Sequence, residues 1–149
     1  MTLLLAFSLL APAHAAPATA RDATGHVVSL DAGTLVVAWR LDDLASIEAL
    51  RVAERAGAEL GVPVLALNLD GVHERSRLVP YLVAQGCAAP TLTDPDGAWR
   101  HRLQVTPGAL VVLGEAGAVA ARIPAGPDTA GTRQALARAL GRTLVAAKP

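Results

Sequence analysis

The chain has one thiol, and little else in it could carry out chemistry. Cys87 is the only cysteine among 149 residues, so it cannot close an intramolecular disulfide. It is either a redox-active or resolving cysteine that forms mixed disulfides, or a small residue that packs like an apolar side chain. No Lys, Arg or His is its sequence neighbour. Nothing in the sequence therefore predicts a lowered thiol pKa, and the structural interpretation is favoured.

The spacing of histidine and aspartate predicts no metal site. His26, His73 and His101 are far apart in the sequence, whereas zinc sites use clustered ligands. The segment DPDG, Asp94–Gly97, is similar to the beginning of a calcium loop, but the remaining ligands of such a loop are absent. Aspartate, proline and glycine form turns without a metal. We therefore expect a turn here, no metal and no cofactor.

The segment AWRLDDLASIEAL, from Ala38 to Leu50, is placed where an active site would be expected. It connects an apolar, β-branched run to a sequence of helical period, and it contains no Cys, His or Lys. Ser46 is a weak nucleophile without a base beside it. Asp42 and Asp43 precede the helical pattern, where carboxylates can accept hydrogen bonds from open N–H groups. The segment therefore predicts a capped helix start built from packing residues.

Composition indicates one compact α/β domain. Hydrophobic residues make up 52% of the chain and aromatic residues only 3%, so Leu, Val and Ala must form the core. This composition suits buried parallel strands covered by helices. Lys and Arg number 13, as do Asp and Glu, for a formal net charge of zero. Nucleic-acid binding needs a clustered positive surface, so we expect no nucleic-acid partner.

The first residues have the character of an export signal. Residues 1–15 contain the apolar run LLLAFSLLAPA and end in AHA, a small-x-small cleavage pattern. The alternatives are an apolar first strand or an uncleaved anchor, although the run is short for a spanning helix. We expect cleavage near Ala15, a periplasmic or extracellular location and no stable membrane span afterwards. Residues 16–25 are then a linker, 26–142 the domain and 143–149 a flexible tail.

Hydrophobic periodicity predicts an alternating order of strands and helices. The expected elements are strands over 26–30, 34–39 and 62–70, helices over 44–60 and 73–86, an extended segment and turn over 89–97, helical turns over 98–105, a hairpin over 106–124 turning at 115–117, and a helix over 128–140. Alternation in the first half predicts parallel pairing. The hairpin predicts an antiparallel edge to a mixed central sheet.

Three strings, in this order, resemble the thioredoxin-like superfamily, specifically the exported TlpA/ResA-type redoxins. They are DATGHVVSL, TLVVAW with the following IEAL, and PTLTDPDGAWRHRLQVTPGALVVLGEAGAVAARIPAG. The resemblance extends over roughly Asp22 to Leu140. It implies a thioredoxin-like α/β fold with a C-terminal β-hairpin and helix. It also implies thiol–disulfide oxidoreductase ancestry.

The resemblance also assigns the site residues. The family carries W-C-x-x-C where this chain has Leu44, Ala45, Ser46 and Ile47, so Leu44 and Ile47 replace both reactive cysteines. Thr106 and Pro107 match the family's cis-proline loop, which pairs with substrate backbone; an ordinary trans proline is the alternative. Trp39 either lines the groove beside the missing cysteines or closes the core.

The function implied is that of a degenerate, exported redoxin that binds a protein or an extended peptide. The groove near Leu44 and Pro107 would hold the peptide by backbone pairing. A second hypothesis is a thiol–disulfide oxidoreductase that uses Cys87 alone or with a partner thiol, and it requires an exposed Cys87 with a lowered pKa. In a third, an exposed Leu44/Ile47 patch docks onto another exported redox protein.

Overall fold

The computed structural model describes residues 18–71, 75–124 and 128–141. The expected signal peptide, the expected tail and His73 lie outside the described residues. The helices and strands are β1 Thr19–Arg21, β2 Val27–Ser29, β3 Leu35–Trp39, α1 Leu44–Leu60, β4 Val64–Asn68, α2 Arg75–Ala84, β5 Thr91–Thr93, α3 Ala98–Leu103, β6 Leu110–Leu113, η2 Glu115–Gly117, β7 Val119–Ile123 and α4 Thr129–Ala139.

A five-stranded mixed sheet in the order β5-β4-β3-β6-β7 forms the centre of the fold. β3 pairs in parallel with β4, and β4 with β5. β6 runs antiparallel to both β3 and β7. The predicted parallel half, the antiparallel hairpin and the central position of residues 34–39 are confirmed. All five residues of β3 are buried, as expected of a strand covered on both faces.

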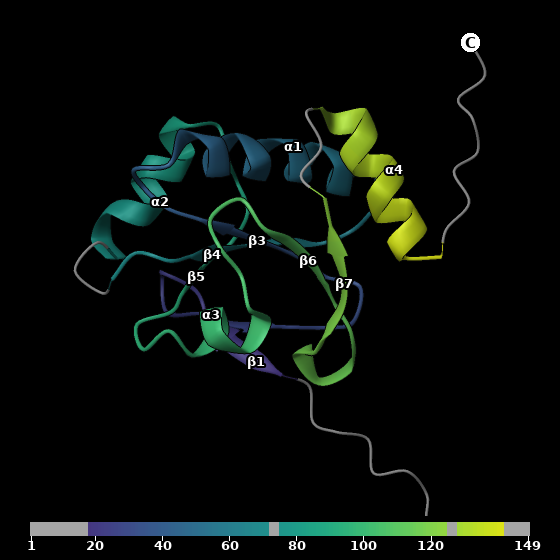
Figure 1. The fold of residues 1–149 in the computed structure, drawn as a ribbon. Coiled ribbons are helices and arrows are strands. Elements are labelled where there is room, and N and C mark those ends of the chain that lie inside the picture. Colours follow the sequence, from purple (N-terminus) through teal and green to yellow (C-terminus); the bar gives the residue numbers. More distant parts are fainter. Residues whose placement is uncertain (1–17, 72–74, 125–127, 142–149) are drawn as a thin grey trace, which may run out of the picture.

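Helices cover the two faces of this sheet unequally. Figure 1 shows α1, α2 and α4 on one face, and α3 with β1 on the other. Alternate side chains of β3 divide between the two layers because successive residues of a strand point to opposite faces. Leu35, Val37 and Trp39 pack with α1, α2 and α4. Val36 and Ala38 pack with residues from β2 and α3.

The expected linker contains a strand. Thr19–Arg21 forms β1 and pairs antiparallel with β2, from Thr19 opposite Ser29 to Arg21 opposite Val27. The connecting turn is organised by Asp22, whose carboxylate accepts hydrogen bonds from the Thr24 hydroxyl and from the backbone N–H groups of Thr24 and His26. The bond from Thr24, more than the others, lowers the pKa of Asp22. Asp22 thus fixes a hairpin in a segment whose small residues gave no strand pattern.

Gly57 allows α1 to lie against the beginning of β4. A Cβ at this buried position would come within 2.6 Å of the Val64 side chain and 2.9 Å of the Val62 carbonyl oxygen. The second atom belongs to the backbone and cannot rotate away. Close packing of α1 on the sheet therefore requires glycine at this position.

Gly57→Ala is expected to destabilise the domain although alanine is the better helix former. Helix propensity favours the change by about 1 kcal/mol, while overpacking in a core costs about 1–3 kcal/mol. We expect a net loss of up to about 2 kcal/mol in urea unfolding, the difference between these opposing effects. Arg55→Ala, at an exposed position of the same helix, should stay within about 0.5 kcal/mol of the wild type. A gain in stability for Gly57→Ala would contradict the close approach.

Candidate functional site at the carboxyl end of the central strand

The helix that follows β3 begins with a well-formed cap. The Asp43 carboxylate accepts hydrogen bonds from the backbone N–H groups of Ala45 and Ser46. The Ser46 hydroxyl donates to the Asp43 carbonyl at 2.8 Å and accepts from the Arg40 N–H at 3.1 Å. The predicted start of the helix at Leu44 is confirmed. Of the two aspartates, Asp43 is the cap and Asp42 binds Arg40 instead.

Leu44 and Ile47 occupy very different environments at this helix start. The Leu44 residue is 73% exposed, whereas Ile47 is 2% exposed and packs in the core. Neither side chain can attack a disulfide or bind a metal. The exposed apolar surface is therefore supplied by Leu44 and does not extend to Ile47.

The bond before Pro107 is trans, because the described residues contain no cis peptide bond. The cis-proline prediction is therefore wrong. Thr106, Pro107, Gly108 and Ala109 form a turn closed by a hydrogen bond from the Ala109 N–H to the Thr106 carbonyl at 3.0 Å. Gly108 has φ of +83°. Proline followed by a glycine of positive φ is the pattern of a type II turn, in which the proline is trans.

This turn lies at the end of β3 that leads to α1. The Gly108 N–H donates to the Ala38 carbonyl at 2.8 Å, and the Ala38 N–H donates to the Ala109 carbonyl at 3.0 Å. Thr106 is exposed, and its N–H donates no hydrogen bond to any described residue. The fold thus brings an open backbone donor and the beginning of α1 to the same end of the central strand.

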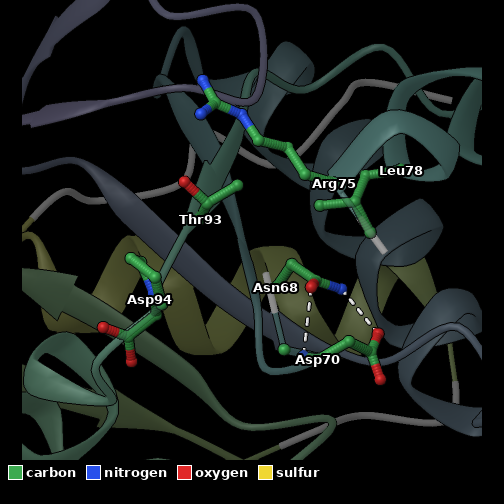
Figure 2. A pocket seen from close by; sticks show the side chains of 8 residues that line it. Asn68, Asp70, Arg75, Leu78, Thr93 and Asp94 are labelled. Carbon is green, nitrogen blue, oxygen red and sulfur yellow. Dashed lines mark hydrogen bonds between the residues drawn. The ribbon is translucent and has the colours of Figure 1, made fainter. Parts of the chain in front are cut away.

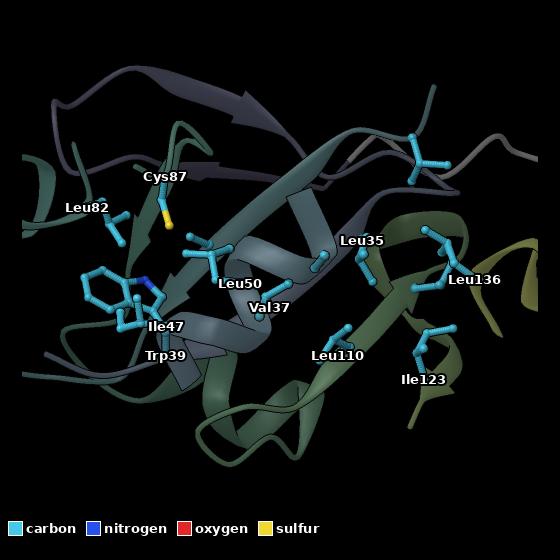
Figure 3. Close-up of a cluster of buried hydrophobic side chains, with 14 of the residues drawn as sticks. Leu35, Val37, Trp39, Ile47, Leu50, Leu82, Cys87, Leu110, Ile123 and Leu136 are labelled. Carbon is cyan, nitrogen blue, oxygen red and sulfur yellow. The ribbon is translucent and has the colours of Figure 1, made fainter. Parts of the chain in front are cut away.

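Trp39 closes the core and does not line a groove. It is fully buried and stacks on Tyr81 of α2, with ring centroids 6.1 Å apart and planes 6° from parallel. Its indole N–H has no hydrogen-bond partner among the described residues. Figure 3 shows it beside Ile47 and Leu82 in the layer between the sheet and the helices. Of the two interpretations of Trp39, the structure supports the core position.

Cys87 belongs to the same core. It is 4% exposed, and Figure 3 shows it close to Leu82 and Leu50. Burial, reinforced by the negative charge of Glu54, raises the pKa of its thiol to about 11. The oxidoreductase hypothesis requires an exposed Cys87 with a lowered pKa. In the structure Cys87 is instead buried, and the pKa of its thiol is raised.

Asp70 anchors the loop before α1, and sequence reasoning did not identify it. Its carboxylate accepts from the Leu41 N–H at 2.8 Å and from the Asn68 amide at 2.8 Å. The Asp70 N–H in turn donates to the Asn68 side chain, so the two residues are joined twice (Figure 2). The sequence did contain a signal for this site. Ligand-binding residues of α/β proteins gather at the carboxyl ends of parallel strands, and Asn68 and Asp70 lie at the carboxyl end of β4.

A small cavity opens next to this anchor. Its volume is about 50 Å³, enough for a few water molecules. Asn68, Asp70, Arg75, Leu78, Thr93 and Asp94 line it, together with Gly71 and Pro95. It is too small for an organic ligand, so it marks the polar end of the sheet without defining a cofactor site.

Asp94 is a structural residue. Its carboxylate accepts from the backbone N–H groups of Trp99 at 2.9 Å and Arg100 at 2.7 Å, which ties the Asp94–Gly97 turn to the start of α3. The predicted turn is confirmed. Within the described residues, no three His, Cys, Asp or Glu side chains are grouped so that they could hold a metal ion.

Comparison with solved structures identifies the fold. Thio-disulfide isomerase from Thermus thermophilus superposes with a TM-score of 0.63 at 18% identity, over 86% of this chain and 94% of that one. A secreted Mycobacterium tuberculosis disulfide oxidoreductase homologous to Escherichia coli DsbE gives 0.61 at 16%, over 80% and 94%. A thioredoxin-like protein from Aeropyrum pernix gives 0.59 at 12%, over 82% and 89%.

These likenesses show that the chain has the thioredoxin-like fold, as the sequence resemblance implied. Neither the models of known protein families nor the curated proteins compared include a match. None of the described helices is long and apolar enough to span a membrane.

Proposed function

We propose that this chain is a thioredoxin-fold binding module that holds an extended segment of a partner protein and carries out no thiol–disulfide chemistry of its own. One observation carries the proposal: the helix start that holds the reactive cysteines in the resembling family has Leu44 and Ile47, and Leu44 is 73% exposed. At this exposure the Leu44 side chain adds little to the stability of the fold, since it stays in water in both the folded and the unfolded chain. It is therefore free to contact an apolar side chain of a partner.

The turn beside the helix start supplies the second half of the proposed mechanism. The exposed Thr106 has an N–H without an acceptor among the described residues. An extended peptide can add its backbone to such an open donor, while its side chains contact neighbouring surfaces. In this mechanism Thr106 fixes the peptide backbone, Pro107 fixes the turn and Leu44 supplies the apolar contact.

A random octapeptide library displayed on phage tests the proposal. We expect selection on the wild type to enrich peptides with an apolar residue at one position. Synthetic copies should shift the amide resonances of Thr106 and Leu44 and protect the Thr106 N–H from exchange. Leu44→Glu, which is exposed and should leave the fold intact, should lose this binding. Absence of enrichment, or shifts confined to other surfaces, would contradict the proposed function.

We also propose that the chain is exported and loses residues 1–15. The apolar run and the AHA pattern at the start of the sequence support this, and one structural neighbour is described as secreted. When the full chain is expressed in a secreting bacterial host, the intact mass of the purified protein should correspond to a first residue of Ala16. Retention of residues 1–15 in the purified protein would contradict cleavage.

A further inference from the structure

A polar depression lies beside the helix start, on the opposite side of β3 from the Thr106 turn. It has a volume of about 360 Å³ and is lined by Arg40, Leu41, Asp42, Asp70 and Arg77. β3 lies between β4 and β6 in the sheet. Because neighbouring strands lie roughly 4.8 Å apart, a peptide that pairs with Thr106, which precedes β6, and continues past the end of β3 reaches this depression on the β4 side within about three residues.

The Arg40 guanidinium already holds a carboxylate in the free protein. Its Nη2 donates a hydrogen bond to one oxygen of Asp42 at 3.2 Å. Its Nε lies 3.2 Å from the other oxygen and donates its N–H to Asp70. The guanidinium is thus paired with the Asp42 carboxylate through one charge-assisted hydrogen bond. The two side chains are 45% and 71% exposed. Such a solvated pair contributes little to stability, so a competing carboxylate can displace Asp42 at low cost.

Asp70, by contrast, is committed to the fold and keeps Arg40 in place. Its side chain is 10% exposed, and it lies 3.4 Å from the Arg40 Nε. Its oxygens also accept from the Leu41 N–H and the Asn68 amide. Asp70 therefore anchors the arginine and is not available to a ligand.

We propose that Arg40 is a specificity-determining residue that selects partner segments with an aspartate or glutamate close to the apolar residue that contacts Leu44. This inference rests on the proposed function and names its substrate class. In the free protein, Asp42 occupies the position of the partner's carboxylate. Arg77 lines the wall of the same depression.

The test uses the peptides selected on the wild type and compares two variants with opposite expected effects. Arg40→Gln should weaken binding of acidic peptides about three- to tenfold, as expected for loss of a solvent-exposed charge-assisted hydrogen bond. Asp42→Asn removes the internal competitor and should tighten binding about two- to fivefold. Arg138→Gln, an exposed arginine in the last turn of α4, is the matched control and should change nothing.

The outcomes separate this inference from the proposed function. Selected peptides that contain Asp or Glu, with the two opposite responses and weaker binding at high salt, would support it. Selected peptides that are apolar without acidic residues, that carry Lys or Arg instead, or that bind equally to all variants would overturn it and leave the binding module intact. Failure to select any peptide would overturn both.

Discussion

The double variant Leu44→Cys/Ile47→Cys is expected to form an intramolecular disulfide and to catalyse the reduction of insulin by dithiothreitol. Side chains three residues apart on a helix are neighbours, within the distance that a disulfide can bridge. The exposure pattern is favourable, since position 44 is open to a substrate and position 47 is buried. The positive end of α1 should lower the pKa of the thiol at position 44.

The rate of insulin reduction should be at least about tenfold higher with the double variant than with the wild type. The thiolate is the attacking species, and the wild type presents none at this site. Leu44→Cys alone is the matched control: it has the accessible thiol but no resolving partner, and it should form mixed disulfides without turnover. The aspartate at position 43 faces the same helix start and should keep the thiol pKa higher than a neutral cap would. If the double variant formed no intramolecular disulfide, the assignment of Leu44 and Ile47 to the reactive positions would be wrong.

Trp39→Ala is expected to cause the largest loss of stability of any single substitution at the site. The side chain is fully buried and stacks on Tyr81. Replacing a buried aromatic side chain by alanine costs about 3–5 kcal/mol, because the cavity left behind collapses only in part. This is a large fraction of the roughly 5–15 kcal/mol that stabilises a typical domain, so the variant should unfold at markedly lower urea concentration.

Trp99→Ala provides the matched comparison in the same experiment. Trp99 is only partly buried. The Arg102 guanidinium lies over its ring, 5.1 Å from the ring centroid. An exposed cation–π contact contributes about 0.5–1 kcal/mol, so this substitution should cost much less. Equal losses for the two tryptophan variants would contradict the assignment of Trp39 to the core.

Much of the fold could be predicted because its signals are local. The run Leu35–Trp39 is apolar throughout, and the helical period from Leu44 ends at Gly61, which adopts φ of +65° as a helix C-cap. These patterns depend only on neighbouring residues. β1 was missed because Thr19–Arg21 has no large apolar residue and pairs through a turn that Asp22 organises.

The site was harder to predict because its contacts join distant segments. Asp70 reaches the Leu41 N–H only because β3 and β4 pair with Trp39 opposite Asn68, and a parallel register is not visible in the sequence. At Pro107 the family resemblance predicted a cis proline, whereas the local sequence correctly favoured a turn with a trans proline. The dipeptide Pro-Gly is itself a type II turn pattern, and Gly108 adopts the positive φ that this turn requires.

The alkylation rate of Cys87 by iodoacetamide, measured against pH in the folded protein, tests most directly whether thiol chemistry is open to this chain. Burial and the raised thiol pKa, about 11, predict slow modification through neutral pH, no midpoint near the roughly 8.5 of a free thiol, and a sharp increase on unfolding in urea. The thiolate fraction of the folded protein becomes large only as pH approaches the folded pKa of about 11. Stability falls as pH rises from roughly 8.5 to that value, because in this range the unfolded chain releases a proton that the folded chain still holds. Rapid modification of the folded protein with a midpoint well below roughly 8.5 would contradict the account, since it would reveal a poised thiolate and restore the oxidoreductase hypothesis.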